Sequence, residues 1–393
     1  MDRKLSQWFA FFVLALTVRE ASADAVLDWN KIAIDAVIAA RQAAPETTRS
    51  MAIVHTAMFD AVNAVESKYQ PYRQGIAAPA HMALTRLFPD QVGRLDASFA
   101  EWLGATTDPG ARSGSAFGAS VGADAFTARA NDGTAPVAAY RPLAMPGRYV
   151  PTTMPVFVSW ANAKPWLMSR PDQLRPGPPP ALMSAQWATD YNEIKSLGGK
   201  NSATRTKEQT EIGLFWLVIG APAWNPIVRE LSSRGNRTLS QNARLFALVY
   251  LSAADSLVAV FDAKYHYEFW RPITAIRNGD IDGNDATLQD AAWTPLVETP
   301  MHPEYPCAHC INAGAVGAVL ESEFGSGTLE PFSMASPALP GAVRRWSRIA
   351  DYVNEVSDAR VWSGVHYRTS ARVGEAMGRA IGEAAVRTAL REK

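Results

Sequence analysis

Apolar residues recur along most of the chain at three- and four-residue spacing, which is the period of an amphipathic helix. In residues 47–66, for example, the apolar positions are Met51, Val54, Met58, Ala61, Val62 and Val65. Comparable stripes occur in residues 28–42, 91–104, 110–130, 183–196, 206–219, 240–270, 310–323, 341–359 and 368–390, and no segment shows sustained strand-like alternation. The pattern therefore predicts an all-α bundle of ten or more helices.

The helical period is lost between residues 131 and 181, where prolines are frequent and three follow one another at 178–180. Proline lacks a backbone donor and favours extended or turn structure, so we predict a crossover that runs over the surface. It would connect an N-terminal helical half, residues 24–130, to a C-terminal half, residues 182–393, within one bundle.

The first residues have the pattern of an export signal. Two positive charges, Arg3 and Lys4, precede an apolar run from Trp8 to Val18, and residues 21–23 read Ala-Ser-Ala. The run is shorter than the about twenty residues that span a bilayer. We predict a signal peptide over residues 1–23 and a periplasmic or secreted protein, with an uncleaved membrane anchor as the alternative.

Charge gives no reason to expect a polyanionic partner. The 393 residues carry 38 Lys and Arg and 38 Asp and Glu, without a run of five or six like charges. We therefore expect no nucleic acid as a partner, and no membrane partner once the signal is removed.

Three short clusters carry candidate chemistry, and the first is "KYHYEFWRP", residues 264–272. The spacing predicts that Lys264 and Arg271 project from nearly the same side of one helix, which Pro272 ends. Glu268 lies between them. The alternative is a solvated face on which Glu268 pairs with both cations.

The second cluster is "PEYPCAHC", residues 303–310, which contains both cysteines of the chain. The helical period starts directly after it. Cys307, Ala308 and His309 are therefore predicted to lie at or just before a helix N-terminus, where free backbone N–H groups and the helix dipole favour an anion.

The third cluster, "RVWSGVHYRTS" at residues 360–370, adds Arg360 and His366. The following helix has glycines four residues apart at 374, 378 and 382. These glycines predict a close helix–helix contact.

Together the clusters suit a tetrahedral oxyanion. The guanidinium groups of Arg271 and Arg360 and the ammonium of Lys264 would bind its oxygens. Of the two histidines, one can attack or ligate the central atom while the other transfers protons. No trio of carboxylates or histidines with the spacing of a divalent-metal site accompanies them.

At these residues the chain resembles a known superfamily. The order K-x6-R-P, P-S-G-H and R-x5-H-x3-D is typical of the vanadium-dependent haloperoxidases and the type 2 phosphatidic acid phosphatases (PAP2 superfamily). The chain is most similar to the secreted or periplasmic bacterial haloperoxidase-like branch, to which "RSMAIVHTAMFDAVNAV" and "DGNDATLQDAAWTPL" are also similar. The resemblance implies a large helical bundle of the acid phosphatase and vanadium haloperoxidase type.

The resemblance also implies roles. The equatorial oxygens of vanadate or phosphate would be bound by Lys264, Arg271, Cys307, Ala308 and Arg360. His366 would ligate vanadium, or become phosphohistidine in a phosphatase, and His309 would be the acid/base group.

Three positions depart from the family motifs. Cys307 replaces serine, so a weak S–H donor stands where a hydroxyl is expected. Ala308 replaces glycine. Ser370 replaces the aspartate four residues after the second histidine, which leaves the orientation of His366 without its usual support.

The Cys-x-x-Cys spacing has two other interpretations, a redox pair and a zinc site. A thioredoxin-like redox pair would need a βαβ context, which the helical flanks do not provide. A zinc site using His302 or His309 would need further ligands. If Cys307 and Cys310 bridge in an oxidising compartment, we expect the reduced protein to bind the oxyanion more tightly, because a free Cys307 would face the anion.

Three functions remain open. A haloperoxidase would use vanadate as cofactor and oxidise halide with hydrogen peroxide. A phosphatase would need no cofactor and would hydrolyse a small phosphomonoester in the same site, and a pseudoenzyme would bind phosphate without turnover. In the family, the position seven before the acid/base histidine tends to be phenylalanine in chloride oxidisers and histidine in bromide oxidisers, so His302 favours a haloperoxidase acting on bromide or iodide.

Overall fold

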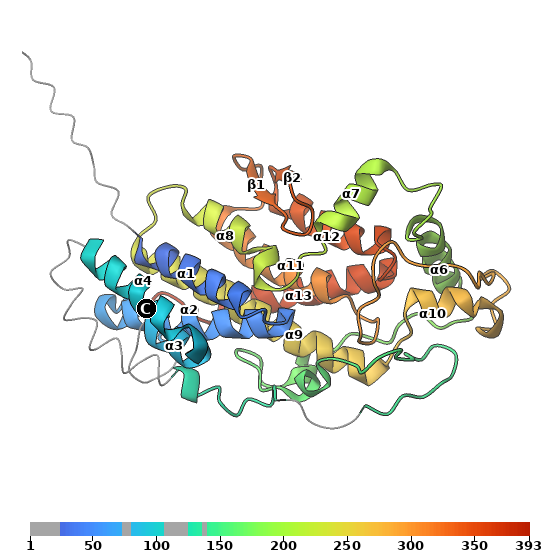
Figure 1. Cartoon of the computed structure of the whole chain (residues 1–393), viewed down its shortest axis with the longest axis horizontal. Coiled ribbons are helices and arrows are strands. Elements are labelled where there is room, and N and C mark those ends of the chain that lie inside the picture. The colour runs from blue at the N-terminus through green and yellow to red at the C-terminus, as the bar shows by residue number, and fades with distance from the viewer. Residues whose placement is uncertain (1–23, 73–79, 106–124, 136–139) are drawn as a thin grey trace, which may run out of the picture.

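The computed structural model describes residues 24–72, 80–105, 125–135 and 140–393. The predicted signal peptide and most of the predicted helix at 110–130 lie outside the described residues. Within them, the all-α prediction is confirmed (Figure 1). The helices are α1 (Ala25–Ala39), α2 (Ala44–Glu66), α3 (Ala80–Leu87), α4 (Val92–Ala105), α6 (Ala185–Leu197), α7 (Lys207–Phe215), α8 (Asn225–Ser232), α9 (Leu239–Tyr267), α10 (Pro272–Arg277), α11 (Ala308–Phe324), α12 (Ile349–Trp362) and α13 (Arg368–Thr388).

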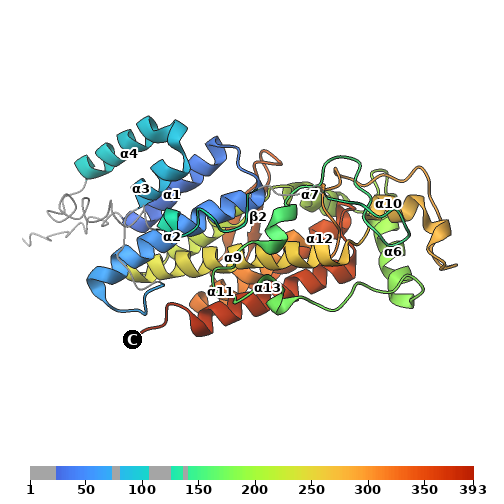
Figure 2. The same cartoon turned by 90° about the horizontal axis from the view of Figure 1, so that it is seen from below.

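Helix α9 is the centre of the bundle. It packs against α2, α11 and α13, and Figure 2 shows it running between α2 on one side and α11 and α13 on the other. Thr238 caps its first turn in a reciprocal pair of hydrogen bonds with Gln241. Its most apolar 18-residue window has a mean hydropathy of 1.7, enough to cross a membrane by composition, yet the whole window is buried inside the protein. The apolar character of α9 is therefore explained by its position in the core.

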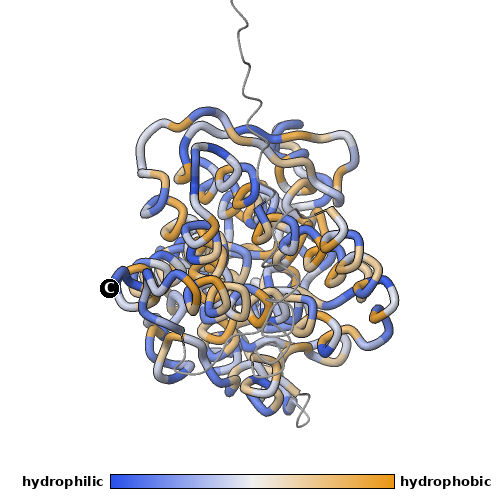
Figure 3. Tube along the Cα trace, turned by 90° about the vertical axis from the view of Figure 1, so that its left-hand side faces the viewer, coloured by the Kyte–Doolittle hydropathy of each residue, from blue (hydrophilic) through white to orange (hydrophobic). Residues whose placement is uncertain are grey.

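Viewed along the long axis, hydrophobic and hydrophilic positions alternate around the coils (Figure 3). In α13, which packs on α9 and α11, the buried residues recur at three- and four-residue spacing, for example Gly374, Gly378 and Ile381. This arrangement is the one that three- and four-residue spacing predicts.

Among the described residues the bundle carries one β-hairpin, which the sequence pattern did not predict. Strands β1 (Phe332–Ala335) and β2 (Val343–Trp346) are antiparallel, and the helix expected over 341–359 begins only at Ile349. Phe332 and Trp346 are paired across the strands and both are buried, with ring centroids 5.9 Å apart. Four residues are too few for strand alternation to stand out from a helical period.

The predicted helix over 240–270 is also divided. Helix α9 ends at Tyr267, Glu268 takes a left-handed conformation with φ of 50°, and Pro272 is the first residue of α10. Proline is favourable at that position because the first helical N–H has no intrahelical acceptor. Lys264 and Arg271 therefore do not share one helix face, and that prediction is wrong.

The glycine prediction is confirmed by the packing of α13 on α11. A Cβ atom added to Gly378 would lie 2.0 Å from the Ile311 carbonyl oxygen, and one added to Gly374 would lie 2.5 Å from that of Cys307. Only glycine permits this approach. The contact holds the first turn of α11 beside the segment that carries His366.

The proline-rich crossover is tied to α9 by buried carboxylates. Asp255 accepts hydrogen bonds from the backbone N–H groups of Trp166, Leu167 and Met168, at 2.6, 2.8 and 2.9 Å. Further along, Arg175 forms two hydrogen bonds with Asp262. The crossover thus packs against the bundle core at fixed points.

Candidate active site

The three sequence clusters meet at a cavity of about 930 Å³. Its deep end is formed by residues from the start of α10, the start of α11, the end of α12 and the turn before α13. The predicted site residues that line it are Arg271, His302, Ala308, His309, Arg360 and His366. Segments separated by up to about a hundred residues therefore converge on one site, as the motifs predict.

Lys264 does not line the cavity and is fully buried beside the residues that do. Its ammonium group donates hydrogen bonds to the carbonyl oxygens of Pro303 (2.9 Å) and Glu304 (2.7 Å). Burial, followed by the nearby charge of Arg271, places the pKa of Lys264 well below its ordinary value. In this structure Lys264 holds the 303–304 backbone in place and contributes positive potential without lining the cavity.

Arg271 connects three segments of the site. Its Nε donates to the His302 carbonyl oxygen and its Nη1 to that of Val365, both at 2.8 Å. Nη2 lies 3.0 Å from His302 Nδ1, and Nη1 lies 3.4 Å from His366 Nε2. The guanidinium is thereby fixed beside His366.

A carboxylate that the sequence analysis missed supports His366. Glu304 Oε1 lies 2.8 Å from His366 Nδ1 and accepts a second hydrogen bond from the Tyr367 backbone N–H at 3.1 Å. Ser370, at the family's aspartate position, lies near enough to lower the pKa of Glu304, but its hydroxyl forms no hydrogen bond to the described residues. Glu304 therefore takes over the orienting role whose loss the Ser370 substitution suggested. The available signal was its place in "PEYP", as the only acidic residue of that cluster.

The His366–Glu304 pair determines which ring nitrogen is free. Burial, then Arg271 and Lys264, lowers the pKa of His366 well below its ordinary value, so the ring is neutral. Burial raises the pKa of Glu304 to about 7, against the opposing effect of Lys264 and Arg271. When Glu304 is ionised, above a pH of about 7, it can accept a hydrogen bond only from a protonated Nδ1, and the lone pair of the neutral ring then lies on Nε2.

Among the described residues that line the cavity, Arg360 Nε, His309 Nε2 and Trp224 Nε1 are buried without a hydrogen-bond partner. Arg360 donates from Nη1 to the Trp216 carbonyl oxygen at 3.0 Å, but its Nε has no acceptor. His309 is hydrogen-bonded to the Val218 backbone and its Nε2 is buried without a partner. Buried polar groups are normally hydrogen-bonded, so these atoms indicate a ligand position.

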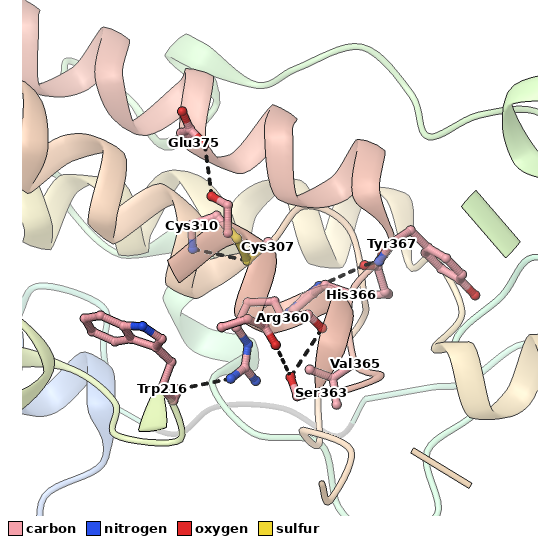
Figure 4. Close-up of a disulfide and its surroundings, with 12 residues drawn as sticks. Trp216, Cys307, Cys310, Arg360, Ser363, Val365, His366, Tyr367 and Glu375 are labelled. Carbon is pink, nitrogen blue, oxygen red and sulfur yellow. Dashed lines mark hydrogen bonds and ion pairs between the residues drawn. A yellow bond between two sulfur atoms is a disulfide. The ribbon is translucent and has the colours of Figure 1, made fainter. Parts of the chain in front are cut away.

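The two cysteines form a disulfide, with their Cα atoms 5.4 Å apart (Figure 4). Both are fully buried, pack with Val361 and Ala371, and do not line the cavity. The Cys307 sulfur accepts the Cys310 backbone N–H at 3.1 Å and has no hydrogen to donate. The prediction of an oxyanion donor at the Cys307 side chain is therefore wrong for this state.

The start of α11 still offers donors. Ala308 and His309 lie in its first turn, where the helix itself provides no acceptor for the backbone N–H groups. Ala308 also lines the cavity. A sulfur in a disulfide is not a zinc ligand, and in the described ranges no three His, Cys, Asp or Glu side chains are grouped as a metal site would require.

His302 lies at the same end of the cavity. Besides its contact with Arg271, its ring meets that of Phe261 edge to face at a centroid distance of 5.4 Å. Burial, followed by Lys264 and Arg271, lowers its pKa well below the ordinary value. His302 is thus a neutral ring beside the oxyanion position.

The donor set fits a tetrahedral oxyanion. Two buried arginines, Arg271 and Arg360, and the buried Lys264 amine surround one carboxylate, so the basic groups outnumber the acidic ones in a region of low dielectric constant. Arginine donors, a helix N-terminus and one free imidazole nitrogen match the oxygens and the central atom of vanadate or phosphate. The residues present fit either anion.

The fold is that of the vanadium haloperoxidases. Residues 244–392 match the family model described as the VCPO second helical-bundle domain. A crystal structure of the first bacterial vanadium-dependent iodoperoxidase superposes with a TM-score of 0.78 at 22% identity, covering 94% of this chain and 96% of that one. A holo-type bacterial vanadium-dependent chloroperoxidase has a TM-score of 0.69 at 18% identity, over 88% and 92% of the chains.

In sequence, the chain is 29% identical over 168 residues to vanadium chloroperoxidase from Curvularia inaequalis. That match covers 35% of this chain and only 28% of the relative's length. The predicted resemblance is confirmed: the chain has the vanadium haloperoxidase fold, and its C-terminal part matches the model of the second helical-bundle domain.

Proposed function

We propose that this protein is a vanadium-dependent haloperoxidase that oxidises bromide or iodide with hydrogen peroxide. His366 would be the vanadium ligand, and His309 the acid/base group. Arg271, Arg360 and the first backbone N–H groups of α11 would bind the vanadate oxygens, with Lys264 adding positive potential from behind.

The observation that carries the proposal is the His366–Glu304 pair. A ligating histidine needs a neutral ring of fixed tautomer, and a carboxylate on its second nitrogen supplies both. With this 2.8 Å contact on Nδ1, His366 Nε2 faces Arg271 Nη1 at 3.4 Å. The contact between Glu304 and His366 also weighs against a pseudoenzyme. That alternative was suggested by Ser370, which stands where the family has an aspartate.

The overall reaction consumes one halide, one hydrogen peroxide and one proton, and yields hypohalous acid and water. Vanadate, when bound, would supply the electrophilic centre that activates peroxide for attack by halide. His309 Nε2 would accept or return the proton, because it is neutral and without a protein partner. The apolar surroundings of the cavity would limit competing reactions with water.

His302 supports bromide or iodide over chloride. It occupies the position that tends to be histidine in bromide oxidisers of this family. Its neutral ring contacts Arg271 and would adjust the field that the guanidinium exerts on a bound oxyanion.

The second candidate is an acid phosphatase. The same donors fit phosphate, and His366 Nε2 could form phosphohistidine during hydrolysis of a phosphomonoester. No cofactor would then be needed, and His309 would protonate the leaving alcohol.

We further propose export to the periplasm or the extracellular space. The charged start, apolar run and Ala-Ser-Ala sequence of residues 1–23 support it. The disulfide between Cys307 and Cys310 also supports it, since such bonds persist in oxidising compartments.

The deciding experiment compares two activities of the purified protein. With vanadate and peroxide, we expect triiodide formation from iodide and halogenation with bromide. Without vanadate, hydrolysis of p-nitrophenyl phosphate measures the phosphatase alternative. Phosphatase activity without halide oxidation would overturn the proposal, and loss of both with retained phosphate binding would indicate a pseudoenzyme.

A further inference from the structure

The cavity is much larger than the oxyanion, peroxide and halide require. Its volume of about 930 Å³ lies near the upper end of pockets that enclose drug-sized ligands, about 300–1,000 Å³. The oxyanion residues occupy only its deep end. The remaining volume needs a separate explanation.

The rest of the lining is mainly apolar and aromatic. Among the described residues, the only charged side chains that line it apart from those at the oxyanion end are Lys200 and Glu298, which have opposite signs. The ring side chains that line it, histidines aside, are Tyr149, Phe157, Trp216, Trp224, Phe261 and Tyr352. This composition favours an uncharged ligand with apolar or ring character.

The cavity opens through an apolar rim. Val150, Leu217, Ile219 and Met301 line it and are still 38%, 36%, 47% and 44% exposed. Apolar side chains gathered around an opening are typical of a ligand entrance, whereas singly scattered ones need no explanation. The rim would desolvate an apolar molecule as it enters.

One wall comes from the proline-rich crossover and is fixed in place. The Tyr149 N–H donates to the Glu268 carbonyl oxygen at 2.7 Å, and the Val156 N–H to that of Met301 at 2.9 Å. The Tyr265 hydroxyl also donates to the Val156 carbonyl oxygen. The wall is therefore preformed, which lowers the entropic cost of binding.

We propose that this cavity binds an uncharged, ring-bearing organic molecule beside the oxyanion centre, and that this molecule accepts the oxidised halogen. The second part rests on the proposed function. An electron pair of the ring carbon forms the carbon–halogen bond while the oxygen–halogen bond of hypohalous acid breaks. The departing hydroxide takes the ring proton as water, so one C–H bond is replaced by one carbon–halogen bond.

Binding is tested with 1-naphthol and vanadate-loaded protein in the absence of peroxide. We expect saturable binding that Ile219→Glu and Val150→Glu each weaken about tenfold, because a charge at the rim must be desolvated. The matched controls are Ile281→Glu and Val343→Glu. Both parent residues are similarly exposed, at 52% and 48%, and neither lines the cavity. Absence of saturable binding, or equal loss in rim and control variants, would overturn the inference.

Product analysis tests the acceptor role. With bromide and peroxide, we expect a ratio of 2- to 4-bromonaphthol that differs from the ratio given by reagent hypobromite, and rim variants should move it towards the reagent value. Triiodide formation, which needs no organic acceptor, should be unchanged in the same variants. Normal triiodide formation with the reagent ratio in the parent protein would overturn the inference and leave the proposed function intact. Absence of triiodide formation would refute the proposed function. The naphthol binding measurement would then test by itself whether the cavity binds a ring-bearing molecule.

Discussion

Two buried histidines, His55 and His366, differ in their surroundings. His55 of α2 stacks between Phe246 and Tyr250 in the first half of α9, at ring distances of 5.0 and 4.7 Å. His366 lies near the other end of the helix, beside Arg271 and Glu304. Both rings are neutral, yet only the second lines a cavity.

The His55 cluster resembles an internal structural network. Its Nε2 meets the Asn30 amide at 2.9 Å, Asn30 and Asn225 bond to each other, and the Tyr250 hydroxyl donates to Asn225. The pKa of His55 is lowered to about 3 by burial and then by Arg229. Uncharged amides and hydroxyls supply most of the partners, although His55 Nδ1 is buried without a partner among the described residues. The two clusters therefore differ in their charge and not in the presence of an unpaired ring nitrogen.

The His366 cluster is different because it concentrates charge. Two arginines and a lysine surround one carboxylate, and Arg360 Nε and His309 Nε2 have no partner among the described residues. Burying this arrangement without an anion is unfavourable. The comparison indicates that unmatched buried charge, and not burial of histidine by itself, identifies the functional site.

The largest expected effect is at His366. His366→Ala should reduce halide oxidation, or phosphatase activity, by about 10³-fold or more and abolish tight vanadate binding, because the ligating or attacking nitrogen is lost. His309→Ala should retain anion binding and lose about 10²–10⁴-fold in turnover. Steady-state rates and vanadate titration measure both, and equal loss of binding in the two variants would contradict the assigned roles.

The converse effect is expected at His55. His55→Ala should lower the free energy of unfolding by about 3 kcal/mol, because it leaves a cavity between two rings and removes the partner of Asn30. Activity per folded molecule should be unchanged. His81→Ala is the control: His81 contacts Asp96 near the surface, and its loss should cost less than about 1 kcal/mol. Urea unfolding measures both, and an activity loss in His55→Ala beyond the unfolded fraction would remove the distinction between the clusters.

A smaller effect is expected when the support of His366 is altered. Glu304→Gln should reduce activity or vanadate affinity by about 10–100-fold, since second-shell carboxylates orient a ligating histidine. Adding Ser370→Asp to this variant should restore part of the loss, because it returns a carboxylate to the family position. Thermal unfolding of both variants checks that the fold is retained. No loss in Glu304→Gln would show that Arg271 alone orients the ring.

Asp255 provides a pH test at the middle of α9, away from the site. Burial raises its pKa to about 6 from an ordinary 3.8, although three backbone N–H groups oppose the shift. Between these values the folded state binds a proton that the unfolded state has lost, so stability falls as pH rises from about 4 to about 6. Relative to Asp255→Asn, the parent should lose about 1–2 kcal/mol of unfolding free energy over this range. A difference that does not change with pH would contradict the shift.

The smallest effect is expected at the disulfide. Its sulfurs lie outside the cavity lining, so reduction should change vanadate or phosphate affinity by less than about threefold, a difference of less than about 1 kcal/mol. Cys307→Ser should respond to reductant as little as the parent does. Titration with and without dithiothreitol measures this. Markedly tighter binding after reduction would support the sequence-based expectation that a free Cys307 turns towards the anion.

Local patterns in the sequence determined much of this protein. The three- and four-residue spacing predicted the bundle because each helix buries one stripe, and the order of the three motifs identified Arg271, Arg360, His309 and His366 as one site. The glycines of α13 predicted its contact with α11, because four-residue spacing places them on one face. Each of these signals is a local spacing of a few residues, although the three motifs together extend from residue 264 to residue 370.

The tertiary structure decided what depends on distant contacts. Glu304 and His366 are separated by 62 positions, and no local pattern indicates that they pair. Three other features also depend on contacts between backbone carbonyls and side chains across the bundle. They are the position of Lys264 outside the cavity lining, the turn at Glu268 and the contribution of the crossover to the cavity. Periodicity reports which face of a helix is buried, but the choice of partner on the buried side is made only when the helices pack.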